Sequence, residues 1–245
     1  AIQMMKYSFL LVGIWWIGFS QYTYYYLPDN KNSNKMHKNV IFNGFRELLK
    51  VWHQIKNILP LKRYLAAFFV YSMAVQTIMI IAAYFGEKEV QWGSDSKRTT
   101  GLIISILVIQ LVAVFGAWIT SKLVEKFGNI KVLMLLNFLW ILICTYAYFV
   151  VTPNDFYMAA FFVGLVMGGI QSLSRSTYSK FIPSDTKDTT SFFSFYDVAE
   201  KVGIVIGMLT YGYIADITGK IQNAILFLIL FFIVGLLLLL RVPKN

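Results

Sequence analysis

Three ionisable residues interrupt an otherwise apolar stretch in the last quarter of the sequence. Asp197, Glu200 and Lys201 are related as i, i+3 and i+4, so a helix places them on one side. At bilayer depth an unpartnered charge costs at least ~2.5–3.5 kcal/mol. These groups should therefore face one another, another helix or a watery cavity, and Asp197 with Lys201 is the natural pair. The alternative is a position at headgroup level, where a lysine can extend to water.

The same carboxylates are candidates for carrying a proton. Burial disfavours the charged form and raises the pKa of a carboxylate toward physiological pH. Protonation of Asp197 or Glu200 would release Lys201 and favour one of two conformations. The cluster is thus a hypothetical proton-coupling site.

Uncharged polar side chains recur within the other apolar stretches, where each needs a hydrogen-bond partner. They are Gln76, Thr77, Gln110, Asn137 and Gln171. Bonding between helices explains any one of them about as well as contact with a solute does. Their recurrence in successive stretches suggests that they converge on a polar pathway.

Small residues form two stripes at helical spacing. One comprises Ala199, Gly203 and Gly207, and the other comprises Gly164, Gly168, Ser172 and Ser176. Such stripes let helix backbones approach closely. We expect a packing role for both, rather than direct contact with a ligand.

The composition indicates that lipid surrounds most of these elements. The chain is 58% hydrophobic and 14% charged, whereas soluble proteins average about 45–50% and about 25%. A hydrocarbon core of about 30 Å needs about 20 helical residues. The uncharged intervals that fit or nearly fit are Tyr7 to Pro28, Tyr64 to Gly86, Thr99 to Ser121, Val132 to Asn154, Phe156 to Ser174, Val202 to Ala215 and Ile221 to Leu240. The sequence predicts an all-α bundle of about seven spans, of which the sixth can cross only with charges inside.

Lysine and arginine are concentrated in alternate loops. The richer loops, together with the C-terminus, should lie in the cytoplasm. This placement explains the net charge of +10 without nucleic-acid binding.

The longest connection runs from Asp29 to Arg63, and apolar residues recur at helical spacing from Ile41 to Leu59. This recurrence predicts an amphipathic helix, which either packs under neighbouring spans or senses lipid.

Catalytic and metal-binding patterns are wanting in the sequence. Cys144 is the single cysteine, and both histidines, His37 and His53, fall in the long loop. No catalytic-triad, metal-ligand or phosphate-loop spacing is present. A membrane-embedded transferase would need an acid/base pair at an interface, and only Arg175 with Asp185 or Asp188 approaches one. We expect neither an enzyme nor a cofactor.

One loop carries a family pattern. It reads Ser121-Lys122-Leu123-Val124-Glu125-Lys126-Phe127-Gly128-Asn129-Ile130-Lys131. It resembles the loop motif of the major facilitator superfamily, roughly G-x-x-x-D-R-x-G-R-R/K, with Ser for the first Gly, Glu for Asp and Asn for one basic residue.

Four further stretches resemble one branch of that superfamily, the vacuole-effluxer-like carriers related to autophagy-linked amino-acid effluxers. They are Trp15 to Phe19, Val75 to Ile78, Gly168 to Ser176 and Phe192 to Lys201. These stretches occur in the same order as in the family, and the resemblance extends along nearly the whole chain.

The resemblance implies a twelve-span fold in two halves, with this chain supplying spans six to twelve. Residues 1–28 would be span six, 29–63 a cytoplasmic loop, and 64–245 the six-helix C-terminal bundle, with the N-terminal half as partner. It implies a secondary transporter for a small solute, first of all amino acids or related metabolites. The ionisable cluster makes a proton the expected coupling ion, and we expect the protein in a bacterial-type inner membrane. The implied cytoplasmic gate residues are Glu125, Lys126, Gly128, Lys131 and Arg175. The rival interpretation is a non-transporting half-carrier that binds a partner in the membrane.

Overall fold

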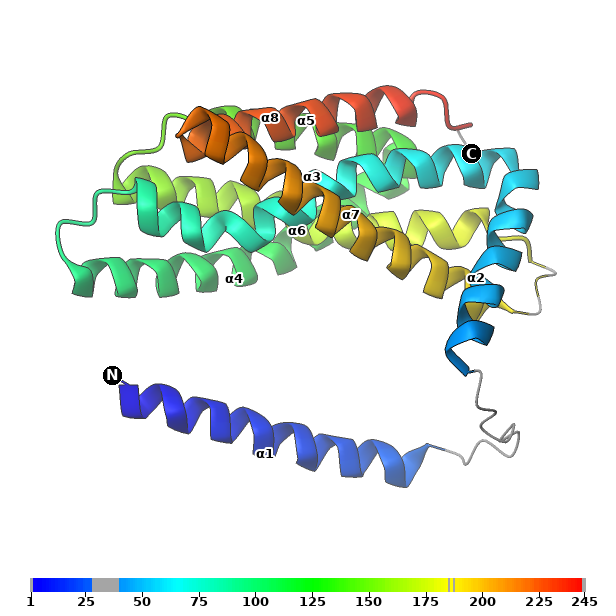
Figure 1. Ribbon diagram of the computed structural model, residues 1–245, viewed down its shortest axis with the longest axis horizontal. Helices are drawn as coiled ribbons and strands as arrows, with labels where there is room; N and C mark the ends of the chain where they lie inside the picture. Colours follow the sequence, from blue (N-terminus) through cyan, green and yellow to red (C-terminus); the bar gives the residue numbers. More distant parts are fainter. Residues whose placement is uncertain (1, 28–39, 185, 187, 244–245) are drawn as a thin grey trace. The chain divides into compact units, whose positions relative to one another are not determined.

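The computed structural model describes residues 2–27, 40–184, 186 and 188–243, and regular structure in these residues is helical (Figure 1). The helices are α1 (Ile2–Tyr26), α2 (Val40–Asn57), α3 (Leu59–Glu89), α4 (Asp95–Phe127), α5 (Asn129–Ala147), α6 (Pro153–Phe181), α7 (Thr189–Thr218) and α8 (Ile221–Leu239). The predicted all-α bundle is confirmed. Helices α3, α4, α6 and α7 run beyond the uncharged intervals at both ends, because a helix can continue into the headgroup layer, where charged side chains reach water.

Among the described helices, α3, α4, α5, α6 and α8 are long and apolar enough to cross a membrane. Residues 1–43, with α1, and residues 44–245 are separate units. Helices α1 and α7 are not among the five described helices that are long and apolar enough to cross a membrane. In α7 the charges Asp197, Glu200, Lys201 and Asp216 interrupt the apolar sequence. A total of seven spans is therefore not confirmed.

In the larger unit α3 is the central helix, and it packs against α8, α7 and α6. Aromatic side chains fill the space between neighbours. Phe68 of α3 stacks on Tyr196 of α7 with centroids 4.1 Å apart, and Trp140 of α5 stacks on Phe232 of α8 at 5.6 Å. Large flat rings buried in pairs fix how these helices are rotated against one another.

The pairing of α4 with α6 depends on glycine. A Cβ added at Gly164 would lie 2.7 Å from the carbonyl oxygen of Ile109, and one at Gly168 would collide with the carbonyl oxygen of Ala113. On α7, a Cβ at Gly207 would collide with Thr77 of α3. The predicted packing role is thus confirmed at these glycines, since only a residue without a side chain permits such approach.

The predicted amphipathic helix is present as α2, which runs across one end of the larger unit, near the starts of α3 and α7 (Figure 1). Val51 and Ile55 are buried in the core. The Arg63 guanidinium donates to the carbonyl of Arg241, which joins the start of α3 to the end of α8 at 3.0 Å. We call this end of the bundle the α2 end.

Candidate functional site

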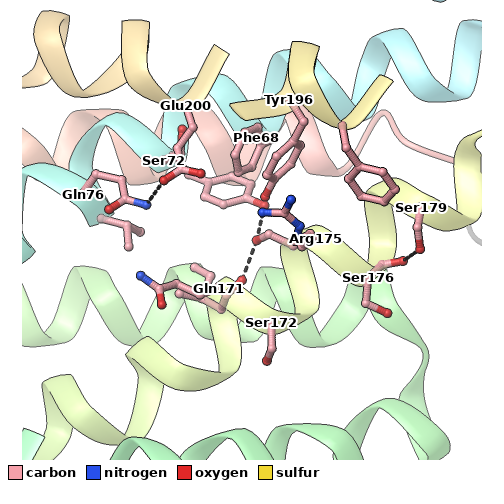
Figure 2. Close-up of a pocket in the computed structure, with 15 residues that line it drawn as sticks. Phe68, Ser72, Gln76, Gln171, Ser172, Arg175, Ser176, Ser179, Tyr196 and Glu200 are labelled. Carbon is pink, nitrogen blue, oxygen red and sulfur yellow. Dashed lines mark hydrogen bonds between the residues drawn. The ribbon is translucent and has the colours of Figure 1, made fainter. Parts of the chain in front are cut away.

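A cavity of about 610 Å³ lies between α3, α6 and α7 and gathers polar side chains from all three helices (Figure 2). Its lining comprises Phe68, Tyr71, Ser72, Val75, Gln76, Ile170, Gln171, Ser172, Ser174, Arg175, Ser176, Ser179, Phe193, Tyr196 and Glu200. Polar groups in an otherwise apolar bundle make this cavity the candidate functional site.

The wall from α3 meets the ionisable cluster of α7 through one hydrogen bond. The Gln76 amide donates from Nε2 to Oε1 of Glu200 at 2.5 Å, and the two side chains point toward each other in Figure 2. The Glu200 side chain is only 17% exposed, and the Lys201 ammonium lies 3.6 Å from the same oxygen. Glu200 is therefore a carboxylate held by an amide on one side and a cation on the other.

The wall from α6 is built on Gln171, Ser174 and Arg175, which are related as i, i+3 and i+4. Gln171 donates from Nε2 to the sulfur of Met79 at 3.2 Å. The Ser174 hydroxyl lies 2.7 Å from the Tyr71 hydroxyl. These bonds fix the α6 wall against α3 beside the cavity.

Arg175 joins α6 to one turn of α7. Its guanidinium contacts Asp197 through two nitrogens, at 3.2 and 3.5 Å. It also lies 5.3 Å from the Phe193 ring centroid and 5.9 Å from that of Tyr196. We call Arg175, Phe193, Tyr196 and Asp197 the Arg175 clasp. Its ion pair is half exposed, with Arg175 54% and Asp197 47% accessible.

The expected pairing of Asp197 with Lys201 is wrong. Asp197 binds Arg175 of another helix, and Lys201 binds Glu200. The planar guanidinium can meet a carboxylate with two parallel bonds while its face rests on aromatic rings. A lysine on the same helix offers neither geometry.

Three predicted pathway residues lie away from this cavity. Thr77 is fully buried against Gly207. Asn137 is buried in α5 and donates to the carbonyl of Leu133 at 2.8 Å. Gln110 lines a different pocket on the side of α4, with Met79 and Met167 nearby. The structure thus brings together Gln76, Gln171, Arg175 and Glu200 and does not bring these three to them.

The other predicted gate residues lie around the turn between α4 and α5. Gly128 adopts φ 83°, a conformation that favours glycine. Glu125 pairs with Lys122 of its own helix at 3.4 Å. Lys126 lies over the Phe127 ring, and Lys131 is exposed.

Asn129, which replaces a basic residue of the loop pattern, links this turn to α6. Its side-chain amide donates to the Thr177 hydroxyl at 2.9 Å and accepts from the Lys180 ammonium at 3.0 Å. Sequence reasoning missed this contact, because nothing local places residue 129 beside the end of α6.

Several cavity residues were also missed, but their spacing carried a signal. Ser72 lies four residues before Gln76, Ser174 three after Gln171, and Tyr196 four before Glu200. A search three or four positions from each predicted polar residue, along the same helix face, would have found them.

Within the described residues, no group of three or more His, Cys, Asp or Glu side chains could hold a metal ion.

The sequence of this chain is similar to those of other proteins and matches one family model. Residues 2–245 match the family model described as "Vacuole effluxer Atg22 like". The chain is 31% identical, over 97% of its length and 54% of the relative's, to the "Uncharacterized MFS-type transporter YxiO" of Bacillus subtilis. It is 26% identical, over 95% of its length and 48% of the relative's, to Autophagy-related protein 22 of Eremothecium gossypii. The chain therefore spans about half the length of these curated relatives.

The fold has a solved counterpart. The crystal structure of a variant of the E. coli fucose:proton symporter FucP aligns with a TM-score of 0.62 and 18% identity, over 89% of this chain and 50% of that one. That likeness concerns the fold alone. The family match over nearly every residue shows that this chain belongs to the Atg22-like vacuole effluxer family of the major facilitator superfamily.

Proposed function

We propose that this chain forms the C-terminal half of a secondary transporter that moves a small polar solute by alternating access. The observation that carries the proposal is the cavity between α3, α6 and α7, which concentrates a guanidinium, a carboxylate, amides and hydroxyls within an apolar bundle. An N-terminal half would line the opposite side of the solute site. The relatives' doubled length supports such a partner.

The cavity chemistry favours a solute that carries both charges or several hydrogen-bonding groups. Arg175 offers a cation and donors, and Glu200 offers an anion and acceptors. Amino acids are therefore the first solutes to test. A proton is the coupling ion that the ionisable groups favour, with protonation of Glu200 or Asp197 weakening the bonds to Gln76, Lys201 or Arg175.

The gate would close at the α2 end, which we place in the cytoplasm of a bacterial-type cell because basic side chains gather there. The Arg175 clasp links α6 to α7 there, and Gly128 and Asn129 lie at the same end between α4 and α5. Breaking the clasp would let α7 move against α6 and open the cavity. The other turn residues, Glu125, Lys126 and Lys131, would meet the N-terminal half.

The experiment is solute counterflow in proteoliposomes that contain the complete carrier. Labelled amino acids are tested singly, with and without an imposed pH gradient. Gln76→Leu should reduce flux at least tenfold, since it removes a cavity amide and the partner of Glu200. Gln110→Leu is the matched control, because the same change falls outside the cavity, and its flux should stay within twofold of the parent.

Two outcomes would contradict the proposal. Equal loss in both variants would mean that the cavity is not the solute site. Binding of labelled solute without any counterflow would favour the non-transporting half-carrier. Unchanged pH-driven flux in Asp197→Asn would remove that residue from coupling.

A further inference from the structure

Helix α2 presents three different faces. Val51 and Ile55 lie on the buried face. A second stripe, at spacing i, i+4, i+7 and i+11, consists of Phe45, Leu49, Trp52 and Lys56. We call it the aromatic edge of α2. Residues at such spacing share one side of a helix.

The opposite edge of α2 has a different character. Glu47 and Lys50 form an ion pair at 2.7 Å there, and Gln54 follows on the same side. Among the α2 side chains that the structure describes, from residue 44 on, this edge carries no large apolar one. The two edges are therefore unequal, although both flank the same buried face.

The first two residues of the aromatic edge are apolar and exposed. Phe45 is 65% and Leu49 43% accessible, so neither is used by the core of the larger unit. Cations accompany them. The Lys56 ammonium lies 5.2 Å from the Trp52 ring centroid. Arg46, the residue after Phe45, is exposed and points about 100° round the helix from it.

We propose that the aromatic edge of α2, with Arg46 and Lys56, binds the headgroup and upper acyl chain of an anionic phospholipid. Exposed apolar side chains with adjacent cations match a ligand that carries a phosphate above a hydrocarbon chain. A nucleic-acid partner would use the cations but would leave Phe45 and Leu49 without an apolar environment.

The position of α2 fits this ligand. After α2, only Ile58 intervenes before α3 begins at Leu59, and α3 is one of the helices apolar and long enough to span a bilayer. The aromatic edge therefore lies next to the level at which the hydrocarbon of the leaflet begins.

The bound lipid would also act on the cavity wall. Trp52 stacks on Phe195 of α7 with centroids 5.8 Å apart, and Phe195 is followed directly by Tyr196 and Asp197 of the Arg175 clasp. Ordering of Trp52 by lipid would hold that turn of α7 in place. This regulatory step rests on the proposed transport function, whereas lipid binding itself does not.

The test measures lipid binding with an environment-sensitive fluorophore on Leu49→Cys in a Cys144→Ala background. The chain in neutral detergent is titrated with short-chain phosphatidylglycerol and, separately, with phosphatidylcholine. We expect a blue shift with phosphatidylglycerol at a concentration at least tenfold lower than with phosphatidylcholine. Arg46→Gln and Lys56→Gln should each weaken phosphatidylglycerol binding about fivefold, and 0.5 M salt should weaken it further.

The matched control replaces one lysine and one arginine at the start of α4, Lys97→Gln with Arg98→Gln, and should change binding less than twofold. Equal weakening in this control would overturn the proposal, because the lipid would then respond to net charge alone. Equal affinity for the two lipids, or displacement by inorganic phosphate, would also overturn it.

Phosphatidylglycerol retained by the unlabelled chain, counted by native mass spectrometry, checks that the fluorophore does not create the site. The Arg46 and Lys56 variants should retain less lipid than the α4 control. Equal retention would contradict the proposal. Neither readout depends on solute flux, so failure of lipid binding is distinguishable from failure of the transport proposal.

Discussion

The bond between Gln76 and Glu200 is the contact that most directly links α3 to the ionisable cluster of α7. Gln76→Leu keeps a side chain of similar size but leaves the Glu200 carboxylate without its amide donor. That carboxylate is only 17% exposed, and the Lys201 ammonium at 3.6 Å remains its other partner. The perturbation therefore isolates one charge-assisted hydrogen bond.

The expected cost follows from this geometry. Hydrogen bonds to charged groups contribute about 1.5–3 kcal/mol to stability. Residual contact with Lys201 and water reduces the loss, so we expect about 1.5 kcal/mol for Gln76→Leu. Gln110→Leu on the side of α4 makes the same chemical change at an exposed position and should stay within about 0.5 kcal/mol of the parent.

The assay is unfolding of the chain in mixed micelles by added sodium dodecyl sulfate, followed by far-ultraviolet circular dichroism. A double variant sharpens it. Because replacing both partners by apolar groups can be nearly neutral, Gln76→Leu with Glu200→Leu should be more stable than Gln76→Leu alone. Strictly additive losses, or equal losses for Gln76→Leu and Gln110→Leu, would refute the assignment of this bond.

Three further predictions address packing, the clasp and a helix cap. Gly116→Ala drives a Cβ into the backbone of Leu165 and should cost about 1–3 kcal/mol in the same unfolding assay, whereas Gly212→Ala, which meets open space, should be neutral or stabilising. A double-mutant cycle between Arg175 and Asp197 should give at most about 1 kcal/mol, since the pair is half exposed, and 0.5 M salt should reduce it. Hydrogen bonds from Ser191 lower the pKa of Asp188. The stabilising effect of Asp188 relative to Asp188→Ala should therefore be present at pH 7 and disappear as the pH falls through the lowered pKa, as measured by thermal melts across pH 2–7.

Local sequence properties determined the helical elements and the candidate polar residues. The apolar intervals predicted helices within α3 to α6 and in α8, and the periodicity after Ile41 predicted α2. Intramembrane charge singled out Glu200, and intramembrane amides singled out Gln76 and Gln171. These properties are local because a helix satisfies its own backbone and its side-chain spacing is fixed at 3.6 residues per turn.

Only the tertiary structure decided which polar groups meet. Periodicity gives the residues that share a face but not the direction in which that face points, because that direction depends on packing against neighbouring helices. Glycines that bring α4 onto α6, and stacked rings such as Phe68 on Tyr196, set that rotation here. They turn Gln76 toward Glu200 and leave Asn137 buried in α5. They also place Arg175 beside Asp197, although 22 residues separate the two in the sequence.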